Sequence, residues 1–197
     1  MRAKKILVLL GHPDTSGLCG DIASTYAEAA KSAGHFVKRL NVSEMQFDYV
    51  LHKGYRKIQP LEPDLLRFQE LVRTCDHLVI IYPNWWSGPP SILKGLFERA
   101  WLPGFAYKYI KTKSGKPTIF WKRLLKGKTA RVIVTAGEHP YLMRLIYGHF
   151  TQQISIAILW FAGFKVREKV FGPADNPPPL TKKLWLDKVR QLGKEGV

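Results

Sequence analysis

Cysteine is scarce in this chain: Cys19 and Cys75 are the only two among 197 residues, and they do not form a C-x-x-C pair. Two cysteines are too few for a disulfide framework, so we expect a reducing compartment. The longest apolar run, residues 154–163 with Ser155 inside it, is far shorter than the ~20 residues that span a bilayer. The apolar stretch at 6–10 is shorter than the core of a secretory signal, and no small-residue cleavage pattern follows it. The sequence therefore predicts a cytoplasmic protein without a membrane span.

Several motifs that mark common active sites are also absent. Neither G-x-x-x-x-G-K-[ST] nor G-x-G-x-x-G occurs, which argues against a P-loop and against a dinucleotide-binding Rossmann turn. There is no G-x-S-x-G serine elbow, and neither cysteine is followed by an arginine six residues later, as a phosphatase-type loop requires. The six histidines show no H-E-x-x-H spacing, so no metal site is expected. Without an obvious nucleophile or metal, we expect the chemistry to belong to a bound cofactor.

Acidic residues are few: 15 Asp and Glu stand against 31 Lys and Arg, which gives a net charge of +16. Such a charge favours an anionic partner, and nucleic acid, anionic lipid and a phosphorylated cofactor all qualify. Basic residues are dense at 108–128 and 182–194. No zinc-finger spacing, RRM motif or basic coiled coil is present, so no specific nucleic-acid partner is expected. A solvated basic surface is the simplest interpretation.

What the chain does contain is an alternation of apolar strands and helices. With 46% hydrophobic and 23% charged residues, it is typical of one globular domain over residues 1–197. Strands are predicted at 4–10, 35–41, 77–82, 131–135 and 164–171, and helices at 22–33, 63–74, 90–101, 142–161 and 180–192. Residues 42–62 and 103–128 read as irregular. This order predicts an α/β fold: a flavodoxin-like, doubly wound, five-stranded parallel sheet of order 2-1-3-4-5 with helices on both faces.

One of these helices indicates a partner. The segment 142–161 is apolar nearly all round, with Ile154, Ile156 and Trp160 on different sides. A helix without a polar face is buried on both sides. In a chain of this size the second surface is expected to be another subunit, so we expect a homodimer.

In a sheet of this kind, three loops meet at the carboxyl ends of the strands: 11–17, 82–89 and 135–141. The first offers His12, Thr15 and Ser16 at a helix N-terminus, which is a site for an anion or a simple N-cap. The second carries Trp85 and Trp86, which either face a planar ligand or cover the sheet edge. Residue types alone leave both alternatives open.

Three motifs resemble the NAD(P)H:quinone oxidoreductases, the DT-diaphorase-like branch of the flavodoxin-like fold. They are Gly11-His12-Pro13 with Thr15-Ser16, the stretch Tyr82-Pro83-Asn84-Trp85-Trp86-Ser87-Gly88-Pro89-Pro90 continuing to Arg99, and Gly104-Phe105-Ala106-Tyr107-Lys108-Tyr109. A later Phe161-Ala162-Gly163-Phe164 is similar to the family's F-C-G-F. The resemblance covers essentially the whole chain. It implies a homodimer with a flavin, FAD or FMN, at each of two inter-subunit sites, and NAD(P)H as co-substrate.

The resemblance also implies residue roles. Thirteen loop residues are implied to bind the cofactor. Those near the flavin phosphate and ribityl chain are His12, Thr15, Ser16, Leu18 and Cys19. Those at the ring are Pro83, Asn84, Trp85 and Trp86, and those beside its pyrimidine end are Thr135, Ala136, Gly137 and Glu138. Tyr141 falls on the tyrosine that stabilises charge on the reduced ring, and Tyr147 stands where some relatives have histidine. Tyr107 and Tyr109 match tyrosines that line the acceptor pocket from the other subunit.

The chain departs from the family pattern at three places. Gly17-Leu18-Cys19 replaces the usual Phe-Asn after the serine, and Glu138-His139-Pro140 replaces small glycine-rich residues. Tyr147 is a poorer proton donor at neutral pH than histidine, since reference pKa values are about 10 and about 6.5. These departures concern the acceptor and the proton relay more than the flavin.

The function that follows is a flavin-dependent NAD(P)H dehydrogenase of the quinone type. Hydride would pass from NAD(P)H to the flavin and then to a quinone or related small electrophile, with ping-pong kinetics. An alternative is a flavin-binding regulatory or ancillary subunit of a membrane transporter, because the basic surface suits contact with a membrane face or an acidic partner. A flavodoxin-type electron carrier is disfavoured, since such carriers usually present an acidic face.

Overall fold

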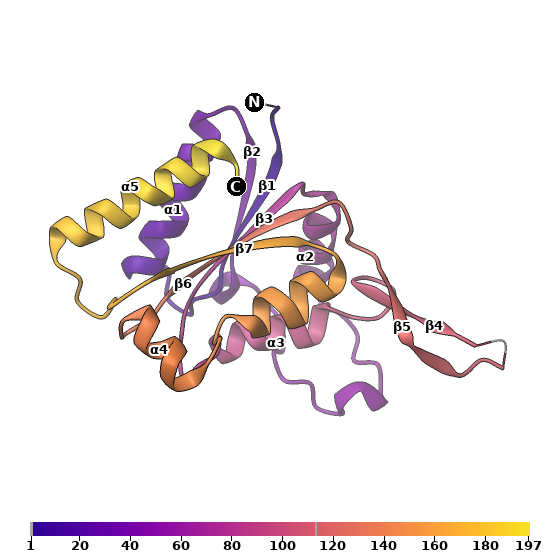
Figure 1. The fold of residues 1–197 in the computed structure, drawn as a ribbon. Helices are drawn as coiled ribbons and strands as arrows, with labels where there is room; N and C mark the ends of the chain where they lie inside the picture. The colour runs from indigo at the N-terminus through magenta and orange to yellow at the C-terminus, as the bar shows by residue number, and fades with distance from the viewer. Residues whose placement is uncertain (1, 113) are drawn as a thin grey trace.

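A five-stranded parallel sheet forms the centre of the computed structural model, which describes residues 2–112 and 114–197 (Figure 1). Its spatial order is β2-β1-β3-β6-β7, that is, 2-1-3-4-5 for the sheet strands in chain order. The strands are β1 (Lys5–Leu10), β2 (Phe36–Asn41), β3 (His77–Pro83), β6 (Thr129–Thr135) and β7 (Lys165–Phe171). The predicted flavodoxin-like topology is therefore confirmed.

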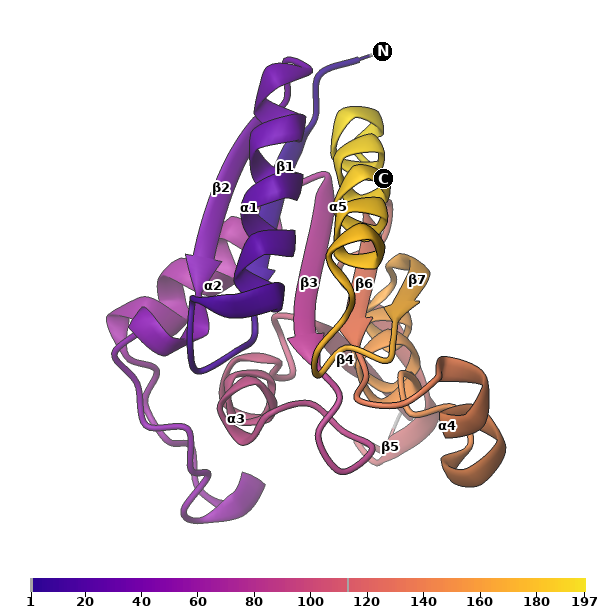
Figure 2. The same ribbon diagram turned by 90° about the vertical axis from the view of Figure 1, so that its left-hand side faces the viewer.

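Helices cover both faces of the sheet (Figures 1 and 2). On one face lie α1 (Gly17–Ser32) and α5 (Pro179–Glu195), which pack against each other. On the other lie α2 (Pro63–Thr74), α3 (Ser91–Ala100) and the π-helical segment η3 (Gln153–Trp160). Strand β1 serves both layers: Ile6 and Val8 belong to the core under α1 and α5, and Leu7 and Leu9 to the core under α2 and α3. This alternation explains why the strand is apolar throughout.

The segment 103–128, expected to be irregular, instead contains a hairpin of β4 (Tyr107–Lys111) and β5 (Pro117–Arg123). This prediction was wrong. The pairing is antiparallel with an irregularity after Tyr109, and most of the described side chains in it are exposed. Because the hairpin buries little, it leaves no apolar alternation by which a sequence pattern would reveal it.

The helix expected over 142–161 is also divided. A short helix, α4 (Pro140–Tyr147), ends at Gly148, whose φ of 70° and ψ of −151° no helix continues. The π-helical segment η3 follows after a turn. Glycine reaches positive φ without the steric cost of a side chain, and it therefore breaks the apolar run here. Among the described residues, no helix has both the length and the apolar character that crossing a bilayer demands.

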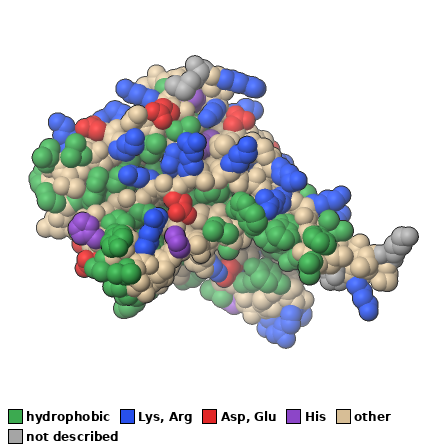
Figure 3. Space-filling view, viewed as in Figure 1, with side chains coloured by type: hydrophobic (Ala, Val, Ile, Leu, Met, Phe, Trp, Pro, Cys, Tyr) green, Lys and Arg blue, Asp and Glu red, His purple; other side chains and the backbone are tan. Residues whose placement is uncertain are grey.

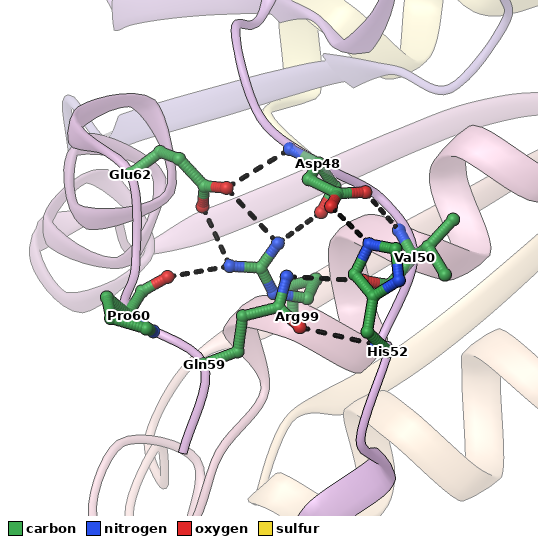
Figure 4. Close-up of polar contacts among 7 residues, drawn as sticks. All are labelled: Asp48, Val50, His52, Gln59, Pro60, Glu62 and Arg99. Atoms are coloured by element: carbon green, nitrogen blue, oxygen red, sulfur yellow. Dashed lines mark hydrogen bonds and ion pairs between the residues drawn. The ribbon is translucent and has the colours of Figure 1, made fainter. Parts of the chain in front are cut away.

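The loop expected at 42–62 is confirmed as largely irregular, with two single 3₁₀ turns, η1 (Val42–Glu44) and η2 (Gly54–Arg56). Arg99 of α3 anchors it (Figure 4). This fully buried guanidinium donates to both oxygens of Glu62, at 2.8 and 3.2 Å, to the Pro60 carbonyl at 2.7 Å and to the Asp48 carbonyl. Burial opposes ionisation of Glu62, but the Asp48 N–H and Arg99 together hold the pKa of Glu62 below its usual value. The loop is thus tied to the core by one arginine.

Candidate functional site

A cleft of about 300 Å³ opens at the carboxyl ends of β1, β3 and β6. It lies where the strand order reverses between β1 and β3, which is the usual ligand position in doubly wound sheets. Its lining comes from the three predicted loops and from the connector after β7: His12, Asp14, Ser16, Gly17, Leu18, Cys19, Pro83, Asn84, Trp85, Thr135, Ala136, Gly137, Ala174 and Asp175.

The N-terminus of α1 faces this cleft. Ser16 is its N-cap, yet the Ser16 side chain makes no capping hydrogen bond, and the first turn contains no acidic residue. The hydroxyl donates instead to Asp14 Oδ2 at 2.7 Å, and the Ser16 N–H donates to Asp14 Oδ1 at 2.9 Å. These bonds lower the pKa of Asp14. The first-turn N–H groups that Ser16 leaves uncapped are donors suited to an anion.

His12 adds a directed donor to the same corner. Its Nδ1 accepts the Asp14 N–H at 2.9 Å, so in the neutral ring the proton resides on Nε2. The imidazole meets Trp85 edge-on, with ring centroids 5.4 Å apart and planes at 70°. Trp85 therefore fixes the orientation of His12, and Nε2 remains available to a ligand.

The double-tryptophan loop is a tight turn. Trp85 and Gly88 exchange two backbone hydrogen bonds, at 2.9 and 3.0 Å, and Trp86 and Ser87 between them have φ of 50° and 61°. Two positive φ angles at the central positions of a two-residue turn define type I′, a conformation that is unusual for non-glycine residues. The turn separates the two rings: Trp85 lines the cleft, and Trp86 is fully exposed.

Asn84 contributes an unpaired polar atom. Its N–H donates to the Thr135 carbonyl at 2.7 Å, which joins the second loop to the third. Its side-chain Oδ1 is buried and has no hydrogen-bond partner within the described chain. A buried carbonyl without a donor is costly, and Asn84 lines the cleft, so its side chain is a candidate for contact with a ligand or water.

The third loop closes the cleft. Cys19 Sγ lies 3.3 Å from Thr135 Oγ1, and burial raises the pKa of the Cys19 thiol to about 11. The thiol therefore stays protonated at neutral pH and is not poised as a nucleophile. At Gly137 a Cβ would lie 3.0 Å from Asp175 Oδ2, so the Asp175 carboxylate is in close contact with this backbone. Among residues 2–112 and 114–197, no three His, Cys, Asp or Glu side chains lie close enough together to hold a metal ion.

Ten of the predicted cofactor-binding residues line the cleft, and three do not. Thr15 turns its carbonyl toward Gly20 of α1, Trp86 points to solvent, and Glu138 lies just beyond the lining. Sequence reasoning missed Asp14 and Gly17, although both lie in the predicted loop 11–17. It also missed Ala174 and Asp175, for which the only available signal was their place after the last strand.

The four predicted tyrosines lie outside the cleft of the single chain. Tyr141 and Tyr147 are on α4 and are 80% and 59% exposed. Tyr107 and Tyr109 line a separate cavity of about 490 Å³ against the loop that Arg99 anchors. Their rings meet at 5.3 Å, and burial raises the pKa of Tyr107. One chain therefore does not bring these tyrosines to the cleft.

An apolar surface accompanies α4 and η3. Its exposed members are Leu145, Ile146, Ile156 and Trp160. The side of η3 that was expected to be buried against another subunit is thus open in the single chain. Exposed apolar side chains on neighbouring segments are typical of an interface when they form one patch.

Comparison with known proteins shows which family has this architecture. A family profile described as a flavodoxin-like fold matches residues 4–192. The guinea pig (Cavia porcellus) NAD(P)H dehydrogenase [quinone] 1 is 25% identical over 223 residues, covering 98% of this chain and 78% of the relative. The structure of an NAD(P)H:quinone oxidoreductase from Methanothermobacter marburgensis superposes with a TM-score of 0.81 at 22% identity, covering 100% of both chains. An FMN-dependent NADH-azoreductase from Bacillus anthracis, solved with FMN, gives a TM-score of 0.69 at 20% identity, over 97% of this chain and 98% of that one.

The family profile spans nearly the whole chain, and the sequence relatives carry the names that the motifs predicted. The two solved structures agree in fold along their full lengths. The chain therefore belongs to the flavodoxin-like fold family, and its resemblance to the NAD(P)H:quinone oxidoreductases is confirmed.

Proposed function

We propose that the chain is a flavoprotein oxidoreductase that uses NAD(P)H to reduce a quinone or a related small electrophile. The curated relatives that resemble it are NAD(P)H dehydrogenases of the quinone type, and the Bacillus anthracis neighbour is an FMN-dependent azoreductase solved with FMN. The observation that carries the proposal is a cleft at an uncapped helix N-terminus, lined by Asn84, whose Oδ1 has no partner in the described chain.

The cleft fits a flavin at both of its ends. A phosphate suits the α1 N-terminus and His12 Nε2, because both donate hydrogen bonds to an anion. A ring N–H suits Asn84 Oδ1, which lacks a donor. Trp85, about half exposed, provides an apolar edge for the ring between these two points. The phosphate end is common to FAD and FMN.

The protein supplies binding and orientation, and a bound flavin supplies two-electron hydride chemistry between NAD(P)H and the acceptor. His12 and the first turn of α1 would hold the phosphate, and Asn84 and Trp85 would hold the ring. Thr135, Ala136 and Gly137 would form the wall of the flavin site on the side of β6. Tyr141 and Tyr147 are assigned the hydroxyl groups that stabilise charge and hold a proton near the ring. This last assignment rests on the family resemblance.

A homodimer is part of the proposal. The exposed apolar side chains on α4 and η3 are better buried against a second copy than left in water. The family resemblance implies that Tyr107 and Tyr109 of the second copy would line the partner's cleft. Light scattering of the purified protein should give twice the chain mass of 22.5 kDa. A monomer at micromolar concentration would contradict this part.

Cofactor uptake tests the proposal directly. Purified protein should be yellow, or become so with FAD or FMN, and mass spectrometry of the released flavin identifies which. Asn84→Leu removes the unpaired acceptor at similar volume and should weaken flavin binding about tenfold. The matched control Asn41→Leu, on β2 outside the cleft, should leave binding unchanged. Failure of the unaltered protein to take up any flavin would refute the proposal.

Turnover tests the reaction. With NADH or NADPH and a soluble quinone, initial rates should follow ping-pong kinetics, because both substrates use one pocket in turn. Flavin binding without turnover would instead favour the second candidate, an ancillary subunit of a membrane transporter. That candidate is supported by the net charge of +16, which suits an anionic membrane face or an acidic partner.

Both cysteines are free thiols, which agrees with the cytoplasmic location that we propose.

A further inference from the structure

The hairpin of β4 and β5 projects from the body of the protein and takes no part in the central sheet (Figure 1). We call residues 107–123 the basic arm. Its base is fixed firmly: Trp121 stacks on Phe161 with ring centroids 4.4 Å apart, and its Nε1 donates to the Phe161 carbonyl at 2.9 Å. Tyr107 meets the same phenyl ring at 5.1 Å. The arm is therefore a structured extension rather than a loose loop.

The charge of the arm is one-sided. The sequence contains no Asp or Glu between Glu98 and Glu138. The arm itself carries six basic residues: Lys108, Lys111, Lys113, Lys116, Lys122 and Arg123. Within the described parts of the chain, none of the ion pairs involves the arm. On the face shown in Figure 3, the projecting end shows basic side chains and no acidic one.

Pairing within the arm brings like charges together. Lys108 lies directly opposite Lys122, and Tyr109 opposite Trp121. Because side chains alternate between the two faces of a strand, Lys108 and Lys122 point away from the face that packs on Phe161. Like charges directly opposite in an antiparallel pair are destabilising. A nearby anion would relieve this repulsion.

The same outward face is apolar between its lysines. Phe120 is two residues before Lys122 and is 64% exposed, and Ile110 is two residues after Lys108. Ile119, at the irregular part of the pairing, is 83% exposed. Basic side chains around exposed apolar ones match the boundary of an anionic bilayer, where apolar groups enter the acyl region and lysines extend to the headgroups.

We propose that the basic arm docks on a bilayer that contains anionic phospholipid, with Lys108 and Lys122 at the headgroups and Phe120 in the interface. This docking is independent of flavin chemistry. A second copy of the chain is a poor occupant of this outward face, because the copy carries the same net charge of +16. Tyr107 and Tyr109, which we propose to meet the partner's cleft, lie on the opposite face of the hairpin. An acidic protein would match the charge, but a lipid surface matches the charge and the exposed apolar side chains together.

Vesicle flotation tests the proposal with the full chain. The protein should float with phosphatidylcholine vesicles containing about 30% phosphatidylglycerol and not with phosphatidylcholine alone. Raising the salt from about 0.1 M to about 0.5 M should weaken binding, because the Debye length shortens. Lys108→Glu with Lys122→Glu should reduce the fraction bound about tenfold or more, and Phe120→Ser should reduce it severalfold.

Matched control variants separate the effect of the charges on the basic arm from the effect of the net charge of the protein. Lys183→Glu with Lys188→Glu, exposed on α5, changes the net charge by the same amount and should bind within about twofold of the unaltered protein. Circular dichroism melting checks that each variant folds. No flotation with the anionic vesicles, or equal loss in the α5 control, overturns the proposal. Arm variants that float as well as the unaltered protein would also overturn it, whatever their oligomeric state in light scattering.

Discussion

The two ends of the central sheet use their polar groups in different ways. At the amino end, neighbouring strands are joined through side chains: Asp76 accepts the Lys5 N–H at 2.8 Å, and His77 Nδ1 lies 2.7 Å from Thr129 Oγ1. At the carboxyl end, Asn84 Oδ1 has no partner in the described chain, and His12 lines a cleft. The amino end also has a cavity, of about 240 Å³, and His77 Nε2 and Arg131 Nε are buried there without a partner in the described chain. What distinguishes the carboxyl end is the uncapped N-terminus of α1 beside its cleft.

Two histidines show the difference most clearly. His77 is almost fully buried, and burial together with nearby Lys4 and Arg131 lowers its pKa to about 3. It therefore serves packing as a neutral ring. His12 lies at the cleft with its orientation set by Asp14 and Trp85. A histidine's position on the sheet, rather than its chemistry alone, decides whether it is structural or available to a ligand.

Removing the anchor of the 42–62 loop should have the largest effect on the carboxyl end. Arg99→Met leaves Glu62 and two backbone carbonyls without their donor, so we expect a loss of about 3 kcal/mol in the free energy of unfolding. Urea denaturation measures this. Lys94→Met is the matched control, because it breaks the partly exposed pair with Glu98 and should cost less than about 1 kcal/mol. Equal effects would show that Arg99 does not anchor the loop.

At the amino end we expect a pH effect from His77. The folded chain keeps this ring neutral down to about pH 3, whereas the unfolded chain takes up a proton below about pH 6.5. Stability should therefore fall as the pH falls from about 6.5 toward 3, by about 2 kcal/mol between pH 6.5 and 5.

The variant His77→Gln tests this effect in urea titrations at several pH values. It should lose that part of the pH dependence, because it has no proton to gain. His149→Gln removes an exposed histidine and should keep the profile of the unaltered protein. A His77→Gln profile as steep as that of the parent would contradict the assignment.

The two adjacent tryptophans offer a sharper comparison within the carboxyl end. Trp85→Ala removes a wall of the cleft and should weaken flavin binding about tenfold, with a smaller effect on melting temperature. Trp86→Ala removes a fully exposed ring and should change affinity by less than about twofold. Fluorescence titration with FAD or FMN measures both. If Trp85→Ala lowers stability but keeps affinity, its ring is structural.

The smallest effect concerns the proposed charge-stabilising tyrosine. Tyr141→Phe removes one hydroxyl on α4 and should lower kcat about fivefold, with little change in flavin retention. Stopped-flow measurement of the two half-reactions locates the loss. Tyr49→Phe, which lies in the loop that Arg99 anchors, is the control and should have no effect. Unchanged turnover in Tyr141→Phe would remove this role.

The sequence predicted the central sheet well, because its strands are apolar on both sides and its helices carry apolar residues at regular spacing. The predicted bounds of α2, residues 63–74, agree fully with the structure. The hairpin escaped prediction because its stability comes from the stacking of Trp121 on Phe161, a contact between residues 40 apart. The break at Gly148 was hidden in a run of apolar side chains that suggested one helix.

The roles of the site loops were also only partly readable. The positions of His12, Asn84 and Thr135 after strands predicted that they would meet, because the carboxyl ends of parallel strands lie at one edge. The sequence could not show that Trp85 and Trp86 point in different directions, since this depends on two positive φ angles. Nor could it place Asp175 against Gly137, a contact that only the approach of β7 to β6 creates.

By itself, the sequence determined the topology, the family and the edge of the sheet where a ligand would bind, because these follow from local apolar periodicity and short motifs. The tertiary structure decided which groups remain unpaired and which are already satisfied. In the folded chain, Asn84 Oδ1 has no partner among the described residues, and burial keeps His77 neutral. The basic arm projects from the body of the protein. These properties depend on burial and on contacts between distant residues, which no local pattern records.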